Sequence, residues 1–142
     1  MRILFDSKKK LHKEPFGCVA PEENCRLRIH IPTSVETAAV NVIFQKDDDG
    51  SRKEIPFALK ETRGAYQVWE SNFSMDAPGL FFYYFTITGR TGTFRLFKQG
   101  DGTNMEAGDC WQVSCVPADF TTPSWAKGAS IYQVFPDRFH RK

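Results

Sequence analysis

The sequence predicts an all-β fold, namely an immunoglobulin-like antiparallel β-sandwich of seven or eight strands, followed by a linker and one further strand. Hydrophobic residues recur mostly with a period of two, in short segments that turn residues separate. Aromatic residues make up 14% of the 142 residues, and aromatic side chains favour strands. A chain of this length fits one domain and buries enough surface to form a core without metals or disulfides.

The strict alternation of residues 26–31 defines the first predicted strand. Leu27, Ile29 and Ile31 share one face of it, polar residues share the other, and Pro32 ends it. The same alternation between turn residues predicts the remaining strands of the sandwich, at residues 39–45, 51–60, 65–73, 80–88, 93–98 and 111–115.

Residues 80–88 carry the strongest strand signal in the chain. A Pro-Gly turn precedes them, and a Gly-containing hairpin turn follows them. The face expected in the core is continuous and apolar and carries Phe81, Tyr83, Phe85 and Ile87. The outward face then carries Phe82, Tyr84, Thr86 and Thr88.

Two other segments give less definite predictions. Residues 65–73 are aromatic on both faces, with Tyr66 on one and Trp69 and Phe73 on the other, so the pattern does not decide which face is inward. Residues 99–109 have no period and are expected to form an irregular loop. Loops of this length in a compact domain are often functional or mobile.

Charge and hydropathy exclude several classes of partner. The net charge of +2 is small and evenly scattered, so nucleic acid is not an expected partner. The apolar run at the N-terminus has three residues, too few for a signal peptide. The longest apolar run, residues 80–85, has six residues, whereas a membrane span needs roughly 20. We therefore expect a soluble, cytoplasmic protein that has no membrane partner.

The four cysteines are expected to be free thiols, because no two form a CxxC pair and a cytoplasmic protein lies in a reducing compartment. Cys110 and Cys115 would point to opposite faces of one strand, so they cannot share a zinc ion. The oxygen-rich segment at 101–109 lacks the ligand spacing of a calcium loop and predicts an ordinary turn. We predict neither a metal site nor a cofactor in this chain.

The composition changes after Pro117. Residues 118–129 have the composition of a linker. Residues 130–135 form an apolar run of the kind found in parallel strands that are covered on both faces. We therefore expect a β-sandwich domain at 1–117, a linker at 118–129, and the truncated start of a second domain at 130–142.

A motif near the end of the chain carries a resemblance to a known family. It consists of Tyr132-Gln133-Val134-Phe135-Pro136-Asp137-Arg138-Phe139, preceded by Trp125-Ala126-Lys127-Gly128-Ala129. It resembles the first barrel strand of α-amylase family glycoside hydrolases, in particular the neopullulanase and cyclomaltodextrinase branch. In that branch a β-sandwich accessory domain precedes a (β/α)8 catalytic barrel. Three upstream segments look similar to that domain: Pro15-Phe16-Gly17, residues 77–84 and residues 100–105.

The resemblance implies that this chain is not itself an enzyme, whereas its parent protein is a glycoside hydrolase. Glycoside hydrolysis needs two carboxyl groups that flank the scissile bond. In the family they lie on later barrel strands, beyond Lys142. The resemblance also allows a calcium ion in the parent enzyme, outside this chain.

The barrel-strand motif comprises Tyr132, Gln133, Pro136, Asp137 and Arg138. Barrel enzymes place their sites at the carboxyl ends of the strands, where Asp137 and Arg138 would fall. These two residues either line the sugar site of the intact enzyme or form a structural ion pair at the top of the barrel. We favour the ion pair.

Two functions of the sandwich follow from the resemblance. In the first, the domain contacts an α-glucan such as a maltooligosaccharide, a cyclodextrin or pullulan, through exposed aromatic rings whose neighbours bind hydroxyl groups. In the second, it docks on its own catalytic barrel and on a partner subunit of a homodimer, and the same rings anchor the interface. The candidate residues are Trp69, Phe82, Tyr84 and Trp111. For each, core packing or domain docking is the alternative that the sequence favours.

Overall fold

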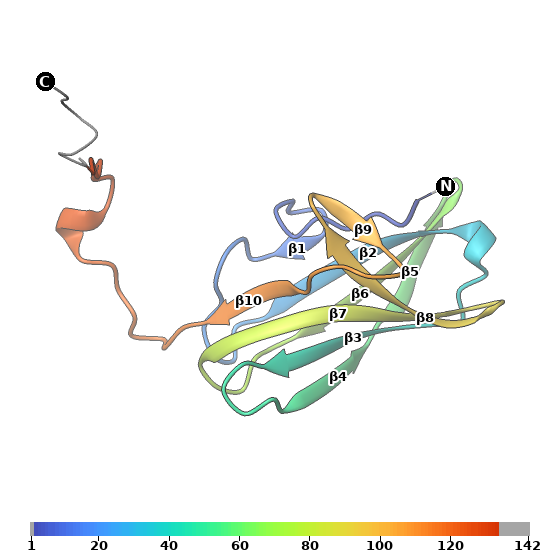
Figure 1. The fold of residues 1–142 in the computed structure, drawn as a ribbon, viewed down its shortest axis with the longest axis horizontal. Helices are drawn as coiled ribbons and strands as arrows, with labels where there is room; N and C mark the ends of the chain where they lie inside the picture. The colour runs from blue at the N-terminus through green and yellow to red at the C-terminus, as the bar shows by residue number, and fades with distance from the viewer. Residues whose placement is uncertain (1, 134–142) are drawn as a thin grey trace, which may run out of the picture.

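The structure, a computed structural model, describes residues 2–133 and contains two antiparallel β-sheets packed against each other (Figure 1). The four-stranded sheet has the order β1 (Lys13–Glu14), β2 (Cys25–Pro32), β6 (Tyr66–Phe73) and β5 (Ala58–Arg63). The six-stranded sheet has the order β4 (Arg52–Pro56), β3 (Ala39–Lys46), β7 (Gly79–Gly89), β8 (Gly92–Gln99) and β9 (Gly102–Asn104), with β10 (Trp111–Cys115) beside β7. Two short 3-10 turns are η1 (Thr33–Val35) and η2 (Ser124–Ala126).

The prediction of an immunoglobulin-like antiparallel β-sandwich is confirmed. The described residues form ten strands, however, rather than seven or eight. Within residues 2–133 there is no helix of the length and hydropathy that crossing a membrane would require.

One predicted strand, at 51–60, is divided between the two sheets. β4 is an edge strand of the six-stranded sheet, whereas β5 is an edge strand of the four-stranded sheet. Pro56 is the last residue of β4, and proline has no N–H to continue the ladder. The buried Phe57 follows it, and its N–H donates to the Val40 carbonyl at 2.8 Å before the chain crosses. Alternation continues through this crossing, so the pattern alone predicts one strand.

A second difference lies in residues 99–109, which the sequence predicts as an irregular loop. Residues 102–104 form β9, which pairs with the end of β8 through Gln99 and Gly102. Gly100 lies in the two-residue turn between them with φ of 57°, a conformation that glycine adopts without strain. The expectation of an irregular loop is therefore wrong for this hairpin.

The core lies between the two sheets, and β7 contributes its largest residues. Tyr83, Phe85 and Ile87 are completely buried, as the alternation of that strand predicts. The face of β6 that carries Trp69 and Phe73 points into the core. The sequence pattern does not decide which face of this strand is inward. The aromatic-rich composition thus produces an aromatic core.

The four cysteines are free, as predicted, and two of them belong to the core. Cys25 and Cys115 are buried. Burial raises the pKa of the Cys25 thiol to about 11. This thiol therefore stays protonated at neutral pH and packs as a small apolar group.

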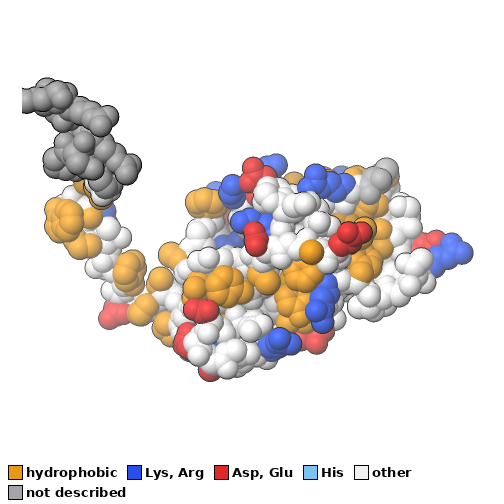
Figure 2. All heavy atoms as spheres, in the orientation of Figure 1, with side chains coloured by type: hydrophobic (Ala, Val, Ile, Leu, Met, Phe, Trp, Pro, Cys, Tyr) orange, Lys and Arg blue, Asp and Glu red, His pale blue; other side chains and the backbone are white. Residues whose placement is uncertain are grey.

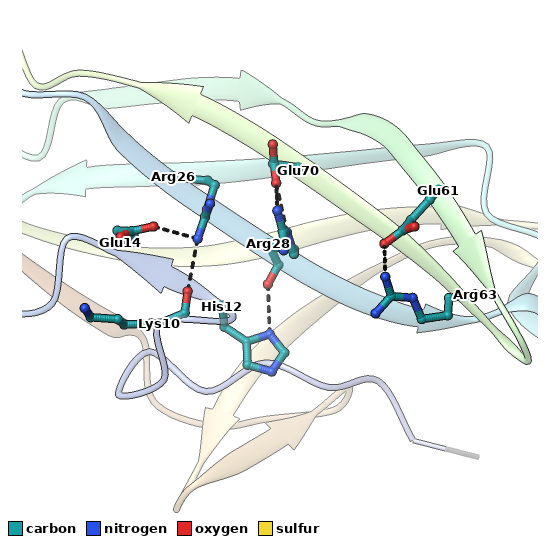
Figure 3. A network of polar contacts seen from close by, with 8 residues as sticks. All are labelled: Lys10, His12, Glu14, Arg26, Arg28, Glu61, Arg63 and Glu70. Carbon is teal, nitrogen blue, oxygen red and sulfur yellow. Dashed lines mark hydrogen bonds and ion pairs between the residues drawn. The ribbon is translucent and has the colours of Figure 1, made fainter.

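The outer face of the four-stranded sheet is charged (Figure 3). Arg28 of β2 pairs with Glu70 of β6, its direct neighbour across the two strands, with an Nε to Oε2 distance of 2.8 Å. Arg26 pairs with Glu14 of β1 at 2.7 Å. The Arg28 guanidinium helps to hold the pKa of the Glu70 carboxyl below its usual value, against the desolvation that raises it. This face is adapted to water.

Tyr83 provides a test of the core. Its hydroxyl is buried and has no hydrogen-bond partner among the described residues. An unsatisfied buried polar group costs about 1–3 kcal/mol. We therefore expect Tyr83→Phe to leave the free energy of unfolding unchanged or to raise it by about 1 kcal/mol, as measured by urea denaturation. Tyr84→Phe, on the outer face, is the matched control. A loss of more than about 1 kcal/mol in Tyr83→Phe would show that the hydroxyl is satisfied.

Candidate functional site

Two of the four candidate aromatic residues lie in the core. Trp111 is 3% exposed and Trp69 is 7% exposed. The register places Trp111 opposite Tyr83, and the two rings stack with centroids 5.9 Å apart. Trp69 lies opposite Ile29 on the inward face of the other sheet. Neither indole presents a face to solvent, so both residues follow the alternative that the sequence favours, core packing, and do not form an exposed binding surface.

The other two candidates, Phe82 and Tyr84, lie on the outer face of β7 and are half-buried. The Tyr84 ring stacks on Phe97 of β8, with centroids 5.5 Å apart and planes inclined by 28°. Ile43 of β3 lies directly opposite Tyr84 on the other side. We call these four residues the outer aromatic patch: Ile43, Phe82, Tyr84 and Phe97.

Sequence reasoning missed half of this patch. Phe94 and Leu96 of β8 face inward as expected, which by alternation places Phe97 on the outer face. The signal for Phe97 was therefore present in the pattern. Ile43 lies between the inward residues Val42 and Phe44, and only the register of β3 on β7 brings it to Tyr84.

Polar side chains surround the patch. Phe82 lies between Gln45 of β3 and Gln112 of β10, which are its direct neighbours in the two adjoining strands. Thr86 lies in the same way between Asn41 and Arg95. Side chains directly opposite each other on neighbouring strands have Cβ atoms roughly 4.5–5.5 Å apart. Amide groups that both donate and accept hydrogen bonds therefore border the apolar rings.

Arg95 adds a fixed positive charge at one side of the patch. Its guanidinium carbon lies 5.7 Å from the centroid of the Tyr84 ring. This geometry is that of a cation–π contact, which restrains the ring. In Figure 2, hydrophobic side chains gather across the middle of the face that carries β7, with Lys or Arg beside them.

The two outer faces of the sandwich therefore differ in chemistry. One is covered by ion pairs, whereas the other exposes aromatic rings bordered by amides and one guanidinium. Such a surface can stack on the apolar face of a ring and hydrogen-bond to its substituents. It can equally cover an apolar surface of a protein.

No metal-binding cluster appears in the described part of the chain. Within residues 2–133, no three His, Cys, Asp or Glu side chains are grouped so that they could hold a metal ion. Asp101 pairs with Lys8 at 2.7 Å, and Asn104 accepts a hydrogen bond from the Glu106 N–H. These oxygen-bearing residues are engaged in local contacts.

The barrel-strand motif lies largely outside the described residues. Tyr132 and Gln133 are described and are exposed, and no strand forms at residues 130–133. Ile131 is 92% exposed and no described strand pairs with it, which is why the predicted strand is absent over these residues. Pro136, Asp137 and Arg138 lie outside the described range, so their predicted place in a barrel stays a prediction.

Several curated proteins match this chain in sequence, the following three among them. An amylopullulanase of Thermoanaerobacterium thermosulfurigenes is 30% identical over 97% of the chain. A second amylopullulanase, of Thermoanaerobacter thermohydrosulfuricus, is 29% identical over 96% of it. Neopullulanase 2 of Thermoactinomyces vulgaris is 38% identical over 40% of it. The chain spans 8 to 10% of the length of these relatives. No family model matches the chain.

Solved structures share the fold, the following two among them. A cyclomaltodextrinase superposes with a TM-score of 0.59 at 17% identity, covering 95% of this chain and 23% of that one. An uncharacterized protein of Listeria monocytogenes EGD-e, solved with glucose, magnesium and calcium, gives a TM-score of 0.54 at 14% identity. That match covers 74% of this chain and 10% of the other. At these identities the likeness shows the fold alone.

Replacing an aromatic residue with alanine is expected to lower the free energy of unfolding more in the core than in the outer aromatic patch. Trp111→Ala removes a buried ring and is expected to lower the free energy of unfolding by about 3–5 kcal/mol. Phe82→Ala removes a half-buried ring and is expected to cost about 1 kcal/mol. Urea denaturation of both variants measures the difference. Equal losses would contradict the assignment of Trp111 to the core and of Phe82 to the surface.

Proposed function

Because this chain is a homologue of the N-terminal domain of α-amylase family glycoside hydrolases, we propose that it is a non-catalytic domain of an enzyme that hydrolyses α-glucans. The curated relatives in sequence include amylopullulanases and a neopullulanase. Their names support substrates such as pullulan and maltooligosaccharides for the parent enzyme. The domain serves that enzyme by contacting its substrate, and the hydrolysis takes place elsewhere in the protein.

The outer aromatic patch is the surface that contacts the sugar. One face of a glucose ring presents mostly C–H groups, which pack on aromatic rings, while its hydroxyl groups point outward and need hydrogen-bond partners. Phe82 and Tyr84 supply the rings. Gln45 and Gln112, on either side of Phe82, supply side-chain amides that can form hydrogen bonds with those hydroxyl groups.

The single observation that carries this proposal is the placing of Phe82 between two glutamines. An interface core is depleted in charged groups and dominated by apolar anchors, with its polar groups at the rim. Here polar amides lie directly beside the ring, within the reach of one bound sugar. The pattern favours a ligand that carries C–H and O–H groups on neighbouring atoms.

The second candidate function is assembly. The stack of Tyr84 on Phe97, with Ile43 beside it, is apolar enough to anchor a contact with the catalytic barrel or with a partner subunit. In this case the patch is covered by protein in the complete enzyme and does not meet free sugar.

Calorimetric titration of the 142-residue chain with maltotriose and with β-cyclodextrin tests the sugar contact. We expect heat of binding in the wild type. In Phe82→Ala and Tyr84→Ala we expect the affinity to fall by about tenfold or more, which corresponds to a loss of at least about 1.4 kcal/mol of binding free energy for each ring. Tyr66→Ala is the matched control, because Tyr66 is a half-buried tyrosine on the four-stranded sheet.

Two results would contradict the sugar contact. One is the absence of binding at millimolar sugar, and the other is an equal loss in Phe82→Ala and Tyr66→Ala. The assembly function is tested in the full-length protein. If it holds, Phe82→Ala shifts the sedimentation of the full-length protein from dimer toward monomer, whereas Tyr66→Ala does not.

A further inference from the structure

Residues 3–12, which we call the N-terminal strap, lie along the edge of β2. Leu4 and His30 exchange two backbone hydrogen bonds, of 2.9 and 3.1 Å. The Arg28 N–H donates to the His12 carbonyl at 2.8 Å. The strap therefore occupies the edge of β2 beyond the short strand β1, which pairs only with Arg26 and Leu27.

The strap also closes the core. Ile3 and Phe5 are buried. The Phe5 ring lies 4.8 Å from Phe85 and 5.0 Å from Trp111, measured between ring centroids, and both contacts are edge-on. Loss of the strap would expose these core rings to water.

Two histidines lie at the junction of the strap and the sheet. His12, on the strap, is 5% exposed. Its ring centroid lies 5.1 Å from that of His30 on β2 and 5.7 Å from that of Phe5. The His12 Nδ1 lies 2.9 Å from the Arg28 carbonyl oxygen (Figure 3), and because a carbonyl only accepts, this nitrogen carries the proton.

Charged groups of both signs surround the pair, and the positive ones oppose a further positive charge. His12 faces Asp6 and Lys9 from the strap and Arg28 from β2, whereas His30 faces Arg28 from β2 and Glu61 and Arg63 from β5. Arg2 and Asp101 line the same cavity as the two rings, and Asp101 pairs with Lys8 at 2.7 Å. The other two carboxylates are engaged as well. Asp6 accepts from the Lys8 N–H and pairs with Lys9, and Glu61 pairs with Arg63 at 3.2 Å.

We propose that His12 and His30 together form a pH-dependent latch, which holds the N-terminal strap on the sandwich while both rings are neutral and releases it when they are protonated. An open cavity of about 600 Å³ between the strap and the β8–β9 turn is lined by both rings, so protons and water reach them. Two imidazolium groups 5.1 Å apart, one of them buried against Phe5, repel each other and lose hydration.

The direction of the pH dependence follows from linkage. Burial lowers the pKa of His12 below its ordinary value of 6.5, and burial together with the neighbouring His12 lowers the pKa of His30. The released strap then binds more protons than the docked strap. Docking is therefore strongest above pH 6.5 and weakens as the pH falls through 6.5 toward the lower pKa values of the docked state.

Release has a structural consequence at β2. Residues 28–31 would lose their neighbour and become an open sheet edge, which can pair with a strand of another chain. The latch thus couples the pH of the surroundings to the exposure of an edge and of an aromatic core.

Hydrogen exchange of the 142-residue chain tests the latch. Between pH 7.5 and 5.0, after correction for the intrinsic exchange rate, the protection of the Leu4 and His30 amides is expected to fall by about tenfold or more. The amides of the β3–β7 ladder are expected to keep their protection. Constant protection at Leu4, or a parallel loss in the β3–β7 ladder, would overturn the proposal.

Two variants assign the effect to the histidine pair. His30→Gln removes one of the two rings at a half-buried position and is expected to reduce the pH dependence of Leu4 protection. His140→Gln removes the third histidine of the chain and is expected to behave as the wild type. The same pH dependence in His30→Gln as in the wild type would contradict the latch. The pH dependence of the wild type tests the proposal independently, whether or not this variant folds.

Discussion

The alternation of side chains along β7 is the constraint on which the rest of the structure depends. β7 pairs with β3, β8 and β10, and its inward residues fill the core while its outward residues form the patch. Residues 81–85 are aromatic at every position, so within β7 it is Ile87, between Thr86 and Thr88, that marks the buried face. The neighbouring strand β3 marks the same face, because Val42 and Phe44 lie on it while Asn41 and Gln45 lie on the other. A slip of one residue would exchange core and patch.

The two outer faces of the sandwich differ in the side chains that they present to solvent. The four-stranded sheet, including its edge strand β5, carries ion pairs and other charged side chains. Charged side chains are well hydrated, and on an edge strand they discourage pairing with other chains. The six-stranded sheet keeps half-buried aromatic rings on its outer face, where the stacking of Tyr84 on Phe97 also contributes to folding. We propose that these rings, bordered by amides, also meet a ligand or partner. The N-terminal strap protects the remaining open edge, beside β2.

Local patterns predicted the regular part of this fold, and contacts distant in sequence decided the rest. The strand predicted at 80–88 matches β7 within one residue at each end, because alternation and flanking turns are local. The alternation continues through the sheet crossing at Phe57 and does not mark it, so Pro56 is the local signal for the crossing. The sequence leaves the direction of Trp69 open because β6 is aromatic on both faces, and the register of β6 on β2 places it opposite Ile29, on the inward face. The N-terminal strap has no hydrophobic periodicity, so the sequence does not predict that it docks on the sandwich.

The central claim is that the outward side of β7 meets α-glucan. Side-chain NMR of the 142-residue chain during titration with maltotriose tests this most directly, because it locates the contact. The account predicts shift changes in the rings of Phe82, Tyr84 and Phe97 and in the side-chain amides of Gln45 and Gln112. Resonances of the charged face, around Arg28, should not move. Changes at the charged face alone, or none at millimolar sugar, would contradict the account.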